Sequence, residues 1–362
     1  MAAYLRDHLA AGHLPGLDPS GELAVEQFHG GHSNLTYLLR YGLPAKASAE
    51  AGGVDLVLRR PPLGPLPPTA HDMAREYRWL SAIHPVFPLA PRPYLLCEDA
   101  AVAGAPFYLM ERRRGIVIRA EEPASLVDHP EERRRVSRAM IETLARLHAI
   151  EVEKNGLAHL GKPKGFVERQ VRGWTERWQR SKIDEVPEMD ALADWLPAHL
   201  PPEPDAPAVV HGDFKLDNVM LDSADIGRIV AVFDWEMCAL GDPLVDLGIV
   251  LAYWSHAMRL EPNDALASVT DRPGWFTRDE VIACYAAASG RDLSRLAFYE
   301  AFAFFKIAVV IQQIYFRYQR GQTRDPRFAQ LDIRVRHLAK QGALARLESD
   351  GFSRRLGRSG EG

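Results

Sequence analysis

The clearest chemical signal in this sequence is an ordered aspartate and asparagine inside one short polar turn. Asp213 follows the apolar residues Val209 and Val210, and Asn218 comes five residues later. Phosphoryl transfer to an alcohol needs a carboxylate that orients the hydroxyl and accepts its proton, together with oxygen ligands that hold Mg²⁺ against the phosphates. Asp213 suits the first role, and Asn218 suits the second.

A second carboxylate follows at the end of the next apolar run. Residues 229–233 read as a buried strand, and Asp234 comes directly after it. A carboxylate in that position is well placed to be the main metal ligand. Either aspartate alone is equally consistent with a turn cap, but the pair with Asn218 between them favours a reactive site. We predict Asp213 as the catalytic base, with Asn218 and Asp234 as Mg²⁺ ligands.

The elements that must position these residues change character along the chain. Apolar and alternating runs predict strands at 23–28, 35–41, 54–59, 94–97 and 107–110, with one helix near 70–83. Helical spacing and composition then predict helices at 131–150, 244–258, 278–288, 293–320 and 328–347, with two tryptophan-bearing helices within 165–196. This order indicates an α+β protein with a β-rich lobe (1–111), a helical catalytic and substrate lobe (112–352) and a flexible tail (353–362).

The pattern His-Gly-Asp-x-x-x-x-Asn at residues 211–218, followed by an apolar strand and Asp-Trp at 234–235, resembles the aminoglycoside phosphotransferase family. That group of kinase-like enzymes also includes choline kinases. The resemblance implies a protein kinase-like two-lobed fold, with a small antiparallel sheet in the N-terminal lobe and a larger helical C-terminal lobe. It also extends to Asp242 and Asp246, for which we expect a supporting role, and we expect His211 to orient the turn.

A kinase also needs a flexible backbone loop over the phosphates. Gly30, Gly31, Ser33 and Asn34 lie between the first two predicted strands, where that loop belongs. Glycines in hairpins are common, so this signal gains weight only from the motif above.

The third predicted strand ends at Arg59, and Glu76 lies in the helix that follows. A kinase needs a cation on this strand for the phosphates and an acid on the helix that holds it. Protein kinases carry lysine at the strand position, so the arginine is a departure, and Arg60 is an alternative. An ordinary surface ion pair is the competing interpretation of Arg59 and Glu76.

The fifth predicted strand leads into Met110, Glu111 and Arg112. In the family, the corresponding backbone holds the edge of the adenine ring. The resemblance therefore implies that these residues form a nucleotide-binding hinge, and it implies ATP or GTP as the co-substrate.

The amino-acid sequences of segments 31–37, 58–62 and 110–115 are most similar to those of certain bacterial phosphotransferases. These phosphotransferases resemble the kinase-like part of acyl-CoA dehydrogenase fusion proteins. This makes a hydroxyacyl or hydroxyacyl-CoA acceptor the favoured substrate. The alternatives are an aminoglycoside or amino-alcohol kinase and an inactive nucleotide-binding module. A protein kinase is disfavoured because no Ala-Pro-Glu follows Asp234. A metal hydrolase built on His211, Asp213 and Asp217 lacks a second ligand cluster.

Bulk composition narrows the remaining classes. A formal net charge of −4 gives no reason to expect nucleic-acid binding. The three cysteines are scattered and form no metal-binding spacing. Lys306 interrupts the most apolar late stretch, which therefore reads as a buried helix and not as a membrane span. We expect a cytoplasmic enzyme, a monomer or homodimer with a small-molecule substrate and neither a nucleic-acid nor a membrane partner.

Overall fold

The computed structural model describes residues 2–9, 22–28, 34–41, 54–62, 72–254, 260 and 269–359. The chain divides into two compact units. The sheet unit comprises Met1–Gly115 and Val230–Cys238, and the helical unit comprises Ile116–Ile229 and Ala239–Gly362. Each unit contains its own set of buried apolar side chains.

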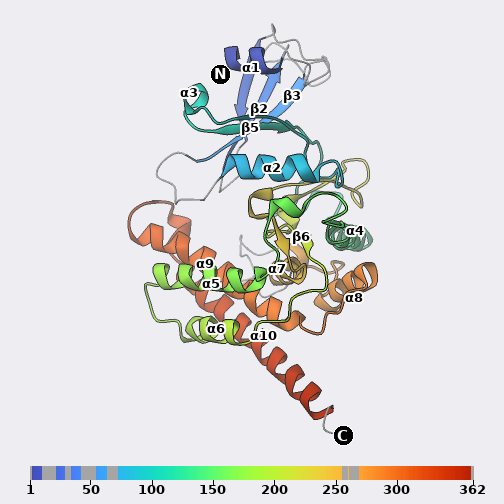
Figure 1. The fold of residues 1–362 in the computed structure, drawn as a ribbon, viewed down its shortest axis with the longest axis vertical. Helices are drawn as coiled ribbons and strands as arrows, with labels where there is room; N and C mark the ends of the chain where they lie inside the picture. The colour runs from blue at the N-terminus through green and yellow to red at the C-terminus, as the bar shows by residue number, and fades with distance from the viewer. Residues whose placement is uncertain are drawn as a thin grey trace. The chain divides into compact units, whose positions relative to one another are not determined.

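The sheet unit is built on five antiparallel strands in the order β1-β2-β3-β5-β4 (Figure 1). These strands are β1 (Leu23–Gln27), β2 (Leu35–Tyr41), β3 (Val54–Arg60), β4 (Pro93–Cys97) and β5 (Phe107–Glu111). Successive side chains of a strand point to opposite faces of the sheet. In β3, Leu58 and Arg60 therefore lie on one face and Val57 and Arg59 lie on the other.

In the part of this unit that the structure describes, the α-helices are α1 (Ala2–Leu9), α2 (Met73–Ile83) and α3 (Ala100–Ala103). Asp72 caps α2, because its side chain accepts the N–H of Arg75 at 2.9 Å. The sequence patterns do not predict α1. Leu5 of α1 packs into the same apolar cluster as Leu39 and Leu58, on the sheet face that carries Arg60.

The helical unit contains the remaining long helices, which are α4 (Pro130–His148), α5 (Phe166–Ser181), α6 (Pro187–Ala198), α7 (Leu244–Trp254), α8 (Arg278–Ser289), α9 (Leu296–Gln319) and α10 (Leu331–Ser359). Its short strands are β6 (Ala208–Val210), β7 (Val219–Leu221) and β9 (Ala239–Gly241), and its 3₁₀ turns are η1 (Ala158–Leu160), η2 (Leu216–Asn218), η5 (Val269–Asp271) and η6 (Pro326–Phe328). β6 pairs with β9 in an antiparallel register. The chain then returns to the sheet unit at Val230–Cys238. This segment contains most of β8 (Ile229–Val232) and all of η3 (Trp235–Met237).

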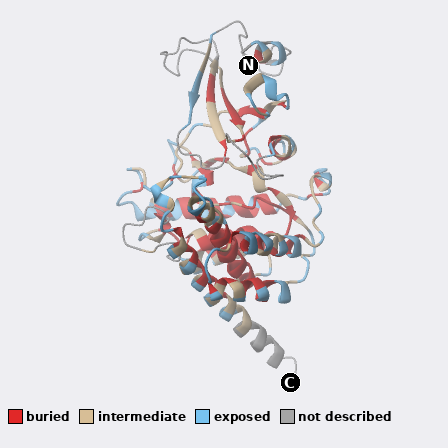
Figure 2. Cartoon of the chain, turned by 90° about the vertical axis from the view of Figure 1, so that its left-hand side faces the viewer, coloured by how far each residue is buried: buried red, intermediate tan, exposed pale blue. Residues whose placement is uncertain are grey.

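Helix α9 forms the centre of the helical unit. In Figure 2, residues coloured as buried are concentrated in the helices of this unit. Helix α7 packs closely on α9 at Gly248, where a Cβ atom would lie 2.5 Å from the carbonyl oxygen of Tyr299. Among the described residues, α9 is the one helix long and apolar enough to cross a membrane, and 72% of its most apolar window is buried inside the protein. Core helices of folded proteins commonly meet the same criterion.

The predicted α+β class is confirmed, and the strands and helices form close to the predicted ranges. One difference lies at the C-terminus, where the backbone of α10 stays helical as far as Ser359, through most of the segment predicted as a flexible tail. Arginine and leucine are good helix formers. Extending an existing helix also avoids the cost of nucleation, so the small polar residues in this segment do not end α10 at residue 353.

Candidate functional site

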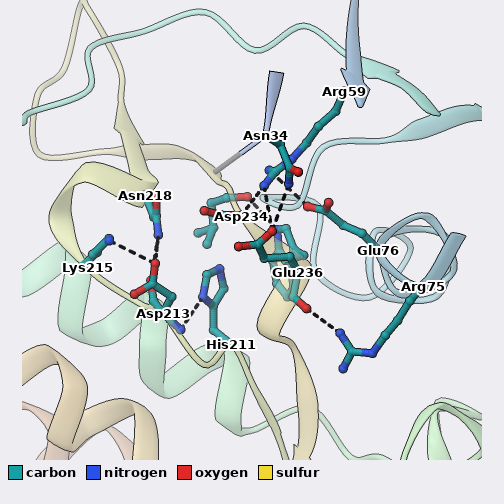
Figure 3. A network of polar contacts seen from close by, with 12 residues as sticks. Asn34, Arg59, Arg75, Glu76, His211, Asp213, Lys215, Asn218, Asp234 and Glu236 are labelled. Carbon is teal, nitrogen blue, oxygen red and sulfur yellow. Dashed lines mark hydrogen bonds and ion pairs between the residues drawn. The ribbon is translucent and has the colours of Figure 1, made fainter. Parts of the chain in front are cut away.

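The turn that carries Asp213 lies in the helical unit, between β6 and β7. Gly212 has φ of 83°, a left-handed conformation that favours glycine, and it turns the chain sharply after β6. The amide nitrogen of Asn218 then donates to the carbonyl oxygen of Asp213 at 2.9 Å and to its Oδ2 at 3.0 Å (Figure 3). The structure therefore brings two of the predicted site residues into direct contact.

Lys215 is a third charged member of this turn. Its Nζ lies 3.1 Å from Oδ2 of Asp213 and 3.9 Å from Oδ2 of Asp217. Burial lowers the pKa of Lys215, but Tyr253 and the two carboxylates outweigh burial and raise that pKa well above its usual value. A fixed positive charge therefore lies beside the predicted base. Sequence reasoning missed Lys215, although its position two residues after Asp213 was a usable signal.

A buried hydrogen-bond network centred on Asp246 fixes the backbone of the Asp213 turn. One carboxylate, that of Asp246, accepts the backbone N–H groups of His211 at 2.6 Å and Gly212 at 2.7 Å. The same carboxylate lies 3.1 Å from Nε2 of His148, whose Nδ1 is 2.7 Å from the hydroxyl of Tyr285. Burial raises the pKa of Asp246, but the hydrogen bonds from His148 and the turn outweigh it and lower that pKa. Asp246 thus carries a negative charge that braces the turn.

A neutral His148 ring can make both hydrogen bonds of this network. Burial lowers the pKa of His148, and Asp246 only partly opposes the effect. A neutral ring that donates from Nε2 to Asp246 has Nδ1 left to accept the hydroxyl hydrogen of Tyr285. His148 ends α4, far from the motif in sequence, and no local pattern singled it out.

The peptide of Gly212 is held on its other side by Lys306. Nζ of Lys306 donates to the carbonyl oxygen of Gly212 and lies 5.5 Å from the centre of the Trp174 ring. Burial lowers the pKa of Lys306 to about 8, against the opposing effect of Asp213 and Asp246. The sequence marked Lys306 only as an interruption of an apolar helix, and the structure places it against the predicted catalytic turn.

The other supporting residues also lie inside the helical unit. Asp242 accepts the backbone N–H of Leu244 at 2.9 Å, at the start of α7, and the hydroxyl of Tyr299 at 2.5 Å. Trp174 and Trp178 of α5 are both buried. Both side chains therefore contribute to the core of this unit.

The sheet unit holds the second group of predicted residues. Arg59 extends from β3 and pairs with Glu76 of α2 at 3.2 Å, and its Nη2 contacts Oδ1 of Asp234 (Figure 3). Glu236 lies 3.8 Å from the same nitrogen, and Asn34 donates to its Oε2 at 3.0 Å. Glu236, two residues after Asp234, was not among the predicted residues, although a carboxylate so close to the predicted metal ligand was a signal.

Burial defines the electrostatics of this second group. Burial raises the pKa of Glu76 to about 7, with Asp234 and Glu236 adding to the effect of burial and Arg59 opposing it. A cavity of about 10 Å³ lies against Arg59, Glu76 and Tyr108. The hydroxyl of Tyr108 also acts on the Glu76 carboxylate and opposes the rise of its pKa.

Local contacts fix the backbone of Asp234 and its neighbours. Asp234 has φ of 67°, which is uncommon for a residue with a side chain and indicates that the surroundings enforce its conformation. Arg75 of α2 donates to the carbonyl oxygens of Glu236 and Cys238. The indole of Trp235 donates to the carbonyl oxygen of Val232 at 2.9 Å.

The predicted hinge residues make several local contacts. The backbone N–H of Glu111 donates to the carbonyl oxygen of Arg92 at 2.8 Å, so this N–H is not left for a ligand. Arg112 pairs with Asp55. Met110 is buried in β5. Side chains at the end of β5 are therefore committed to the sheet unit itself.

The predicted site residues are distributed over both units. Asp213, Asn218, His211, Asp242 and Asp246 belong to the helical unit. Those in the sheet unit are Asn34, Arg59, Glu76, Met110, Glu111, Arg112 and Asp234. The remaining predicted residues, Gly30, Gly31 and Ser33, lie outside the residues that the structure describes.

The donor atoms present suit a hard cation. Among residues with described placement, no group of three or more His, Cys, Asp or Glu side chains is arranged to hold a metal ion by itself. Because Nδ2 of Asn218 donates to Asp213, Oδ1 is the acceptor atom that this amide offers. Carboxylate and amide oxygens are the ligands that Mg²⁺ takes, usually together with substrate phosphates. Asn218, Asp234 and Glu236 therefore have the right chemistry for Mg²⁺.

Comparison with known proteins gives consistent results. A family model described as the phosphotransferase enzyme family matches residues 24–281. A solved structure of a putative aminoglycoside phosphotransferase from Ralstonia eutropha JMP134 is 31% identical, with a TM-score of 0.75, and the match covers 95% of this chain and 96% of that one. A choline kinase structure from Cryptosporidium parvum shares the fold with a TM-score of 0.65 at 11% identity, covering 97% of this chain and 96% of that one. The predicted protein kinase-like fold and the family resemblance are confirmed.

Curated relatives are longer proteins. Acyl-CoA dehydrogenase family member 11 from Rattus norvegicus is 34% identical over 326 residues, which is 89% of this chain and 39% of the relative. Acyl-CoA dehydrogenase family member 10 from Mus musculus is 33% identical over 311 residues, which is 85% of this chain and 28% of the relative. The chain thus spans well under half the length of these relatives, and it matches the predicted subgroup.

Proposed function

Because the chain belongs to the phosphotransferase enzyme family, we propose that it is an ATP-dependent kinase that phosphorylates a hydroxyl group of a small molecule. The observation that carries the proposal is the contact between Asn218 and Asp213 within a braced turn. This contact places a carboxylate beside an amide that offers its oxygen to a cation. Two of the related solved structures, described as ternary complexes of the phosphotransferase APH(4)-Ia with hygromycin B, contain AMP-PNP and ADP respectively, and they support ATP as the co-substrate.

In this proposal, Asp213 orients the acceptor hydroxyl and takes its proton as the γ-phosphoryl group moves from ATP to the hydroxyl oxygen, leaving ADP. The ammonium of Lys215 lies 3.1 Å from the Asp213 carboxylate and orients that carboxylate. Asp246 and Lys306 hold the N–H and C=O of Gly212, so the backbone directly before Asp213 is fixed. The turn needs little rearrangement for the reaction.

Asn218 and Asp234 would hold Mg²⁺, with Glu236 as a further carboxylate beside Asp234. When bound, the ion neutralises charge on the phosphates and aligns them for transfer. Arg59 would contact the phosphates, and Glu76 holds Arg59 from the helix side at 3.2 Å.

For the acceptor, we propose a hydroxyacyl compound or its CoA ester. The support is the similarity to relatives named as acyl-CoA dehydrogenase family members, which the chain matches over 85–91% of its own length. The names of the solved structures would instead favour antibiotics or choline, and these compounds belong in the same test.

The test is incubation with Mg-ATP and a panel of hydroxy acids, their CoA esters, amino alcohols and aminoglycosides, with mass spectrometry of the products. The proposal expects an ATP-dependent gain of one phosphoryl group on a hydroxyacyl compound. Asp213→Asn should abolish the gain, whereas Asp217→Asn, a change on the same turn, should largely preserve it. Phosphorylation of an amino alcohol or aminoglycoside alone would retain the kinase and refute the acceptor. No phosphorylated product, combined with intact nucleotide binding, would identify an inactive nucleotide-binding module.

A further inference from the structure

The sheet unit carries a second pocket on the face opposite Arg59. Arg60 follows Arg59 in β3, and the alternation of side chains places the two guanidinium groups on opposite faces of the sheet. In the strand register, Tyr37 of β2 stands opposite Leu58, and Val25 of β1 stands opposite Leu39. These residues share a face with Arg60. The sequence offered Arg60 as an alternative to Arg59, and the structure excludes that role because Arg60 lies on the other face.

A cavity of about 200 Å³ is present on this face. It is lined by Val25, Tyr37, Leu39, Leu58, Arg60 and Ala103. Five of its six walls are apolar or aromatic side chains, and the sixth is an arginine. An apolar cavity of about 150 Å³ holds a benzene ring, so this cavity has room for a ring with a small substituent.

Arg60 is the one charged residue among those that line the cavity. Its Nη1 donates to the carbonyl oxygen of Ala103 at 2.5 Å. Its buried Nε has no hydrogen-bond partner, and none of the ion pairs between described residues involves Arg60. A buried donor of a charged group that lacks a hydrogen-bond acceptor costs free energy of folding. A guanidinium with unused donors is suited to a planar carboxylate, which it can bind through two parallel hydrogen bonds.

From these observations we infer that the cavity is a binding site for an aromatic or branched monocarboxylate of about the size of benzoate. The ring would lie against Val25 and Tyr37, and the carboxylate would bind the guanidinium of Arg60. This site is separate from Arg59, whose side chain lies on the opposite face of β3. The inference does not depend on the proposed function.

The test uses the purified 362-residue chain and isothermal titration calorimetry with three probes. Benzoate has both the ring and the charge, benzyl alcohol has the ring without the charge, and acetate has the charge without the ring. If both the apolar walls and Arg60 contribute, benzoate should bind at least tenfold more tightly than either of the other two probes. Equal binding of benzoate and acetate would show only a surface ion pair and would overturn the inference.

Two variants locate the site. Arg60→Met keeps the aliphatic stem and removes the charge, and Ala103→Leu fills part of the cavity from α3. Each should weaken benzoate binding at least tenfold, whereas Arg78→Met, which removes an exposed arginine of α2 in the same unit, should leave binding unchanged. Circular dichroism shows whether each variant is folded. Unchanged benzoate affinity in folded Arg60→Met and Ala103→Leu, or no binding to the wild-type chain, would refute the site.

Discussion

Removal of the Asp246 carboxylate tests the bracing of the Asp213 turn most directly. This side chain is fully buried and accepts the N–H groups of His211 and Gly212 at 2.6 and 2.7 Å. It also lies 3.1 Å from Nε2 of His148. In Asp246→Ala, three donors therefore lose their acceptor in a space that water does not reach.

The magnitude follows from these contacts. Each buried donor without an acceptor costs about 1–3 kcal/mol, which gives at least about 3 kcal/mol for the three groups together. We therefore expect Asp246→Ala to lower the free energy of unfolding by about 4 kcal/mol, a large share of the about 5–15 kcal/mol typical of a folded protein. Asp246→Asn should lose less, because one acceptor oxygen remains.

The assay is urea unfolding followed by circular dichroism at neutral pH. Asp225→Ala is the matched control, because it removes an aspartate of the same unit whose partner, Arg135, is exposed. Such a pair contributes less than about 1 kcal/mol. A loss of under about 1 kcal/mol for Asp246→Ala, equal to that of the control, would show that the buried network does not stabilise the turn.

Four further outcomes can be measured. Asp213→Asn should lower turnover by about 10²–10⁴-fold while nucleotide affinity, measured by calorimetry, changes little; a large loss of affinity would assign Asp213 to binding instead. Asp234→Ala should weaken Mg-nucleotide binding at least tenfold, and unchanged affinity would contradict its role as a metal ligand. Arg59→Met should also weaken nucleotide binding, and it should lower stability because Glu76 loses its buried cation; equal stability would argue against that pairing. Finally, the lowered pKa of His148 means that the unfolded chain binds the extra proton first, so stability should fall as the pH drops below about 6.5; His148→Gln should reduce this slope, and an unaltered slope would place the effect on other groups.

The helices, the strands and the motif around Asp213 could be predicted from short segments of the sequence. Period-two and helical spacing predicted β1–β5 and the long helices, since each side chain in these patterns reports which face of its element is buried. The turn at Asp213 was predictable because β6, a glycine and two polar residues lie within one short segment. Lys215 was equally accessible and was overlooked.

Helix α1 and several contacts between distant residues could be identified only from the tertiary structure. Helix α1 has no strong pattern, and it is stabilised by placing Leu5 in a cluster built from distant strands. Lys306 contacts the Asp213 turn directly, and Tyr285 and His148 are linked to it through Asp246. These three residues lie on three different helices, and no local sequence pattern predicts their contacts.

The sequence alone determined the family, the α+β class and the types of reactive group, because these depend on residue identity and local periodicity. The tertiary structure decided which charges meet. It returned residues 230–238 to the sheet unit, where Asp234 contacts Arg59, and it separated Arg59 from Arg60 by the pleat of a single strand. Such long-range pairings follow from burial and packing of the whole unit, which no short segment encodes.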